Sequence, residues 1–183
     1  MINNELLIEL DIDKEPYIKK ITDDKIINLT GESGSGKSYY TNKWKNDDNY
    51  IIIDTDIVFN NMESDNKESV ELRSIFKDKT GKILIDDFDY FYKETINYFK
   101  DINKILVIDS AQYRNMKDLS LLKGQIIIMR TSINTCYKRC IDRYLSINKN
   151  ATQEELEKYK DRKLDMYEWY KVLNEFLIKV YML

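Results

Sequence analysis

One segment of eight residues, between positions 31 and 38, restricts the fold of this chain more than any other. It reads GESGSGKS and fits the pattern G-x-x-x-x-G-K-[ST]. The apolar run 26–30 precedes it, and the stretch 37–45 that follows has helical character. A loop of this kind turns successive backbone N–H groups toward one anion at a helix N-terminus. The sequence therefore predicts a strand, a phosphate-binding loop and a helix, in that order.

Further apolar runs predict the rest of a sheet. The stretches 50–54, 104–109 and 125–130 are rich in isoleucine and valine, and helical stretches separate them. Uninterrupted apolar strands alternating with helices are typical of a parallel sheet that is covered on both faces. The run 6–12 predicts one more strand, at a sheet edge, which Pro16 ends. We expect an α/β fold with three layers and a mainly parallel central sheet.

Two helices are expected in the second half of the chain. The spacing of apolar residues predicts one over 87–100, whereas the run 83–85 before it is compatible with either a strand or a buried helix. Thr152 and Glu155 match a capping box, and a long amphipathic helix should follow the polar loop 146–151. The expected apolar stripe of that helix is Leu156, Tyr159, Leu164, Tyr167, Tyr170, Leu173, Leu177 and Val180.

Composition narrows the class of protein. The 183 residues are 43% hydrophobic and 33% charged, which fits one domain spanning 1–183. The net charge of −3 gives no general basic field, so nucleic acid is not favoured as a partner. The start of the chain lacks a signal-peptide pattern, and no run of 18 apolar residues occurs, so we expect a cytoplasmic protein with no membrane partner.

Residue types that are absent or rare also limit the chemistry. The chain has no histidine, so a carboxylate, water or the substrate must accept any proton that is transferred. Cys136 and Cys140 are its two cysteines and lie four positions apart on an expected helix. This spacing suits packing, and without further thiols or histidines it is a poor structural metal site. We expect both thiols to be reduced and at least half-buried.

Acidic residues end the expected parallel strands, at the edge of an α/β sheet where ligands bind. Asp54 and Asp56 follow one strand and could accept a substrate proton or organise Mg²⁺-bound water, although Asp54 could instead cap the next helix. Asp109 ends another strand and is our preferred Mg²⁺ ligand. Asp86 and Asp87 compete for that role if the run before them is a strand.

The order of these parts resembles the small P-loop kinases typified by gluconate, shikimate, adenylate and deoxynucleoside kinases. The resemblance covers most of 25–175. Besides the glycine-rich segment, it rests on IDTD at 53–56, on IDSAQYR at 108–114, and on Arg139 with Arg143. It implies the strand order 2-3-1-4-5, a lid region at about 139–160, ATP and Mg²⁺ as cofactors, and a small-molecule or nucleoside-like phosphate acceptor.

The resemblance also implies roles for individual residues. ATP would contact the glycine-rich segment and the tyrosine after it, and the metal would contact Ser38 and Asp109. Transfer would depend on Lys37, Asp56, Arg139 and Arg143, and the acceptor would bind Asp54, Asp56, Arg114 and Arg162. The nucleotide-contacting set is Gly31, Glu32, Ser33, Gly34, Ser35, Gly36, Lys37, Ser38 and Tyr39.

The chain departs from these kinases in two respects, so a nucleoside monophosphate is not specially favoured as the acceptor, and two other functions stay open. The adenylate-kinase signature of glycine and proline before an arginine is absent, and no fifth strand is evident after the lid region, where the edge strand 6–12 could take its place. One alternative is an AAA-like ATPase coupled to a partner, with Asp86 or Asp87 as the acid and Ser110 near a sensor position. The other is a nucleotide-binding regulator without efficient turnover.

Overall fold

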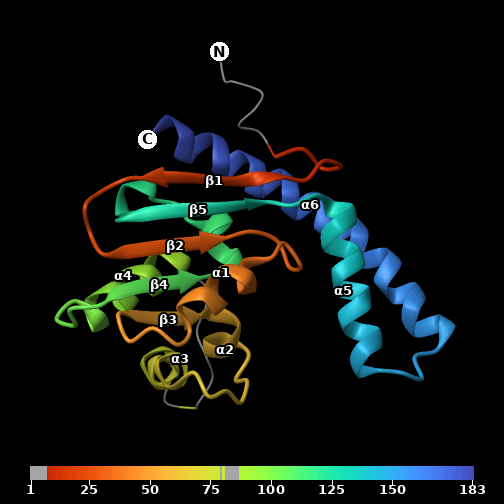
Figure 1. The fold of residues 1–183 in the computed structure, drawn as a ribbon, viewed down its shortest axis with the longest axis horizontal. Helices are drawn as coiled ribbons and strands as arrows, with labels where there is room; N and C mark the ends of the chain where they lie inside the picture. The colour runs from red at the N-terminus through yellow and green to blue at the C-terminus, as the bar shows by residue number, and fades with distance from the viewer. Residues whose placement is uncertain (1–7, 79, 81–86) are drawn as a thin grey trace.

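The structure is a computed structural model that describes residues 8–78, 80 and 87–183. Its centre is a five-stranded sheet in the order β1-β5-β2-β4-β3. Four strands are parallel, and β1 runs antiparallel to its neighbour β5 (Figure 1). The strands are β1 (Lys14–Lys20), β2 (Ile26–Thr30), β3 (Tyr50–Asp54), β4 (Ile105–Asp109) and β5 (Gln125–Arg130). The expected α/β class with a mainly parallel sheet is confirmed.

Helices follow the strands and connect them. Asp87 caps α4 and confirms the helix expected at 87–100, whereas the undecided run 83–85 lies outside the described residues. The helices are α1 (Lys37–Trp44), α2 (Thr55–Phe59), α3 (Lys67–Leu72), α4 (Phe88–Phe99), α5 (Ile133–Ile147) and α6 (Gln153–Met182). Short 3₁₀ turns are η2 (Arg73–Phe76), η3 (Ala111–Asn115) and η4 (Leu119–Leu121).

The expectation of an edge strand at 6–12 was wrong, because the edge strand β1 is the next segment; residues 6 and 7 lie outside the described part of the chain. Residues 8–12 form no strand; β1 instead contains Pro16, which was expected to end it. The pairing of β1 with β5 is irregular between Lys14 and Tyr17. An edge strand tolerates proline at such an irregularity because the missing N–H breaks no regular ladder. The Ile8 N–H donates to Asn174 Oδ1 on α6 at 2.8 Å, so this segment packs on a helix.

Alternation along the strands divides the core between the two faces of the sheet. Ile26, Ile108 and Ile128 face the larger cluster, which contains the buried side chains of α4 and the second half of α6. Leu29 and Met129 face a smaller cluster that Tyr40 and Trp44 of α1 complete. This arrangement fits the expected layers, because a strand covered on both faces carries apolar residues at successive positions.

The last two helices extend together beyond the sheet (Figure 1). Thr152 and Glu155 form the expected capping box at the start of α6. The loop expected at 146–151 begins later, because α5 continues to Ile147. Leu164 is 68% exposed, so its place in the apolar stripe was wrong, and Met166 is buried instead. The first half of α6 lies away from the sheet and has less surface to pack against.

The remaining expectations concern membranes and thiols. None of the helices in the described part of the chain is long and apolar enough to cross a membrane. Cys136 and Cys140 are free and buried on α5, as expected. Burial raises the pKa of the Cys136 thiol to about 11, which keeps it protonated at neutral pH.

Candidate functional site

The glycine-rich segment forms a loop between β2 and α1. Gly34 and Gly36 have φ values of 78° and 99°, which side chains rarely tolerate. A Cβ at Gly34 would also lie 2.6 Å from the carbonyl oxygen of Cys136. Gly36 occupies the N-cap of α1 and has no side chain to close the end of the helix. The loop therefore needs glycine both for its backbone path and for its close approach to α5.

Donors from three elements hold the backbone carbonyl groups of this loop. Lys37 Nζ lies 2.9 Å from the Gly31 oxygen. Thr131 Oγ1, after β5, donates to the Ser35 oxygen at 2.7 Å. Arg139 Nη1, on α5, donates to the Gly34 oxygen at 3.0 Å. Carbonyl groups tied in this way fix the loop conformation and reduce the negative potential next to the N-terminus of α1.

A buried ion pair anchors the start of the loop. Arg114 Nη1 lies 3.0 Å from Glu32 Oε2, and the two side chains are only 5% and 3% exposed. The other Glu32 oxygen accepts the Ser33 N–H at 2.8 Å. The Arg114 guanidinium also lies 3.8 Å from the centre of the Trp169 ring on α6. Burial lowers the pKa of Arg114, and the Glu32 carboxylate opposes this shift.

The structure thus places Arg114, which was expected to bind substrate, against the loop and α6. It is not among the residues that line the cleft, although Ala111 and Gln112 of the same 3₁₀ turn are. Tertiary contacts explain the difference, because Glu32 on the loop and Trp169 on α6 together enclose the guanidinium. Arg114 therefore supports two residues that line the cleft, Glu32 and Trp169, without lining it itself.

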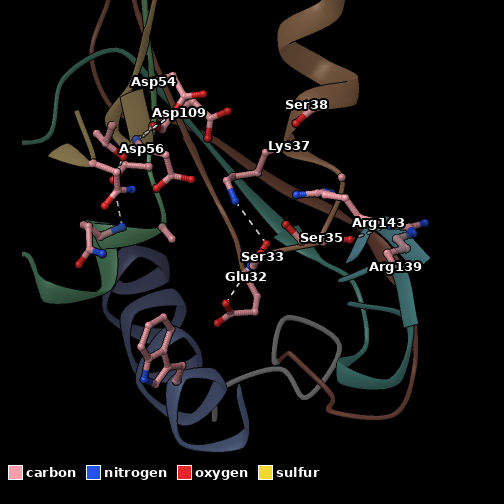
Figure 2. A pocket seen from close by; sticks show the side chains of 18 of the residues that line it. Glu32, Ser33, Ser35, Lys37, Ser38, Asp54, Asp56, Asp109, Arg139 and Arg143 are labelled. Atoms are coloured by element: carbon pink, nitrogen blue, oxygen red, sulfur yellow. Dashed lines mark hydrogen bonds between the residues drawn. The ribbon is translucent and has the colours of Figure 1, made fainter. Parts of the chain in front are cut away.

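Carboxylates gather at the ends of β3 and β4 (Figure 2). Burial raises the pKa of Asp109 to about 7, although the nearby Lys37 opposes this shift. Burial also raises the pKa of Asp54, whose side chain accepts the Asp56 N–H and caps α2. Thr55 Oγ1 connects the two strand ends, because it forms hydrogen bonds to the backbone carbonyl oxygen of Asp109 at 3.2 Å and to Ser110 Oγ at 3.0 Å.

The competing acid Asp87 has a different position. Its side chain caps α4 by accepting the N–H groups of Asp89 and Tyr90, and it does not line the cleft. Asp86 lies outside the described residues. Of the two acids whose positions are described, Asp109 is the one next to the glycine-rich loop, because β4 pairs with β2 and Leu29 is its partner.

Arginines approach the loop from the opposite side. Figure 2 shows Lys37 between the three aspartates on one side and Arg139 with Arg143 on the other. Arg143 is exposed on α5, and Arg162 lines the same cleft from α6. Arg139 and Arg143 share a face of α5 because they are four residues apart.

The loop from Glu32 to Tyr39, the three aspartates and the three arginines of α5 and α6 line one cleft of about 660 Å³, whereas Gly31 does not line it. Its residues are Glu32, Ser33, Gly34, Ser35, Gly36, Lys37, Ser38, Tyr39, Asp54, Thr55, Asp56, Asn60, Met62, Asp109, Ser110, Ala111, Gln112, Arg139, Arg143, Arg162 and Trp169. The sequence did not predict Asn60, Met62, Gln112 or Trp169. A tryptophan on the polar side of an amphipathic helix was the one available signal.

The site suits a metal ion only together with a ligand. Within the described residues, no group of three or more Cys, Asp or Glu side chains is arranged to hold an ion. Mg²⁺ usually takes one or two protein ligands and completes its shell with water and phosphate oxygens. Ser38 and Asp109, both in the cleft, fit that sparse pattern. No protein-family model matches the chain, and no curated protein sequence matches it.

Proposed function

We propose that this protein binds ATP with Mg²⁺ at the glycine-rich loop and transfers the γ-phosphate to a small-molecule acceptor. The observation that carries the proposal is the position of Lys37 in the cleft. It lies at the N-terminus of α1, with carboxylates on one side and arginines on the other (Figure 2). Phosphoryl transfer needs this division, because one side stabilises the phosphates while the other serves the metal and the attacking hydroxyl.

The topology is consistent with the P-loop kinase order. Numbered from β2, the four parallel strands follow the order 2-3-1-4. The antiparallel β1 stands where a fifth parallel strand would be expected, which the run 6–12 had been expected to supply. The glycine-rich loop leaves the middle of this sheet, so a bound triphosphate would lie beyond the carboxyl ends of the strands.

Each part of the site has a role in the proposed reaction. Lys37 would exchange its carbonyl partners for the β- and γ-phosphates, while Ser38 and Asp109 would contact Mg²⁺. The acceptor oxygen attacks the γ-phosphorus, the bond to the β–γ bridging oxygen breaks, and ADP leaves. Asp56 is exposed in the cleft and would accept the hydroxyl proton. Asp54, which caps α2, would position that segment beside the acceptor.

The arginines would compensate charge in the transferring state. Arg139 and Arg143 lie on α5, and Arg162 lies on α6, within the region 139–160 or next to it. Movement of this helical pair, proposed as the lid, would bring the guanidinium groups onto the phosphates and exclude water. Guanidinium forks suit phosphate oxygens because they donate two parallel hydrogen bonds.

Acceptor-dependent release of ADP tests the proposal. Wild-type protein with ATP and Mg²⁺ is assayed with nucleosides, sugars and small hydroxy acids, and one class should raise the rate of ADP release. Asp56→Asn should abolish the stimulated rate and leave nucleotide affinity nearly unchanged. Full stimulation in this variant would contradict the role of Asp56. Turnover that no acceptor stimulates would favour a partner-coupled ATPase, and nucleotide binding without turnover would favour a regulator.

A further inference from the structure

Two exposed aromatic residues, Tyr39 and Trp169, line the cleft, and Trp169 is the one on α6. Its neighbours Met166, Tyr170 and Leu173 on α6 are buried, whereas Trp169 is 47% exposed. The rest of the wall is largely polar and charged. Large aromatic side chains normally bury most of their surface, so an exposed indole inside a ligand-sized cleft indicates a surface for a ligand.

The ring of Trp169 is fixed in place before any ligand binds. The Arg114 guanidinium covers it at 3.8 Å from the ring centre. Arg114 cannot swing away easily, because its own side chain is 5% exposed and paired with buried Glu32. A guanidinium stacked on an indole is held by cation–π attraction, which strengthens when the pair is desolvated. One part of the indole is therefore sealed, and the exposed part borders the cleft.

The ring also lies in a definite half of the cleft. Arg114 belongs to η3, which follows β4 directly, and η3 packs against α6. Ala111 and Gln112, between Asp109 and Arg114, line the cleft as well. Trp169 thus borders the segment that begins at Asp109, on the side of the carboxylates. In the proposed reaction that side receives the acceptor.

We propose that Trp169 is the specificity-determining residue of the acceptor site, and that the acceptor carries a flat conjugated ring beside its reacting hydroxyl. This inference rests on the proposed function in so far as the bound molecule is called an acceptor. Binding of the ring itself does not require turnover. A planar ring laid on the indole replaces water on two apolar faces at once, and a preordered indole loses little freedom on binding. Sugars and hydroxy acids lack a conjugated ring and gain less from such a surface.

Fluorescence of Trp169 gives a direct readout. The chain has two tryptophans, so Trp44→Phe leaves Trp169 as the single reporter. Trp44 stacks on Tyr50, away from the cleft, and phenylalanine keeps an aromatic ring there. The probes are adenosine, guanosine, cytidine and thymidine, with ribose and gluconate as controls that lack a conjugated ring. All are titrated with Mg²⁺ and a saturating non-hydrolysable ATP analogue. At least one nucleoside should change the emission saturably, and ribose and gluconate should not.

Three variants of the wild-type chain separate stacking from packing. Calorimetry should show that Trp169→Ala and Trp169→Leu bind the active nucleoside roughly 10-fold more weakly, whereas Trp169→Phe stays within a few-fold of wild type. The affinity for the ATP analogue should not change in any of them. Proposed nucleotide binding is checked separately with Lys37→Ala, so its failure is distinguishable from failure at Trp169.

The proposal is overturned by any of three results. The first is that no nucleoside changes the emission of Trp169. The second is that Trp169→Ala binds the nucleoside as tightly as wild type does. The third is that Trp169→Ala lowers the affinity for the ATP analogue and not the affinity for the nucleoside. The last result would assign the indole to the base of the nucleotide.

Discussion

Asp54 and Asp109 are paired residues on the adjacent parallel strands β3 and β4. Their register brings two carboxyl groups to the same edge of the sheet, next to Lys37. Burial raises the pKa of both carboxyl groups, and the charge of Asp54 raises the pKa of Asp109 further, so the site holds more negative charge than one lysine compensates. This excess of buried negative charge should cost stability.

The first prediction concerns that cost. Burial raises the pKa of Asp109 from 3.8 to about 7, so the folded protein binds this proton more tightly than the unfolded chain. The free energy of unfolding should therefore fall as the pH rises from about 4 to about 7. Asp109→Asn removes this loss and should stabilise the metal-free protein above pH 7, by up to about 4 kcal/mol.

Urea unfolding at pH 5 and pH 8, with a chelator present, measures the effect. Asp56→Asn is the matched control, because Asp56 is exposed just after the neighbouring strand β3 and should change stability little. Equal stability of wild type and Asp109→Asn at pH 8 would contradict the buried, unpaired state of Asp109. In the proposed function the stabilised variant loses Mg²⁺-dependent activity, a trade-off common at functional sites.

The second prediction compares two glycines of the loop. Alanine at Gly34 meets the Cys136 carbonyl at 2.6 Å, whereas at Gly36 the nearest atoms lie 3.5 Å and 3.6 Å away. Both changes strain a positive φ, at about 1–2 kcal/mol each. Only Gly34→Ala also forces the loop away from α5. Thermal unfolding should show a larger loss for Gly34→Ala, and equal losses would contradict the close packing of loop and helix.

The third prediction tests the ion pair behind the cleft. Glu32→Gln leaves the buried Arg114 charge without its carboxylate and should lower the free energy of unfolding by about 3–5 kcal/mol. Glu168→Gln is the control, because Glu168 pairs with Lys171 at 2.8 Å in an exposed pair worth less than about 1 kcal/mol. Denaturant titration of both variants decides the point. If both variants lose similar and small amounts of unfolding free energy, the Glu32–Arg114 pair does not anchor the loop.

The fourth prediction separates an arginine of the cleft from a neighbouring lysine. Arg143→Ala should lower kcat about 10³-fold with little effect on nucleotide affinity, by analogy with other charge-compensating arginines. Lys138→Ala removes a positive charge from an exposed position on α5 that does not line the cleft, and should leave kcat unchanged. Steady-state kinetics and calorimetry give both quantities. A wild-type kcat in Arg143→Ala would show that Arg143 belongs to a solvated face of α5 and takes no part in the reaction.

Local patterns explain what the sequence predicted well. The loop between β2 and α1 follows from glycines between an apolar run and a helical one, and the start of α6 follows from Thr152 and Glu155. These features depend on residues a few positions apart. Asp109 was expected at the end of its strand for the same reason, since the polar residue simply closes an apolar run.

Long-range packing explains what the sequence missed. Glu32 and Arg114 are 82 positions apart, so nothing local indicated that they would pair and keep Arg114 out of the cleft. Leu164 matched the helical period but is 68% exposed, and it belongs to the first half of α6. Proline usually marks the end of a strand, and Pro16 is acceptable inside β1 only because β1 lies at the edge of the sheet.

Calorimetry with a non-hydrolysable ATP analogue and Mg²⁺ tests the central claim most directly. Wild-type protein should bind the analogue, and Lys37→Ala should bind it at least about 10-fold more weakly, because a charge-assisted contact to phosphate is lost. Lys43→Ala removes the same charge from an exposed position on α1 and should bind like wild type. Thermal unfolding curves check that both proteins are folded. Equal affinity of folded wild type and folded Lys37→Ala for the analogue would contradict nucleotide binding at the glycine-rich loop.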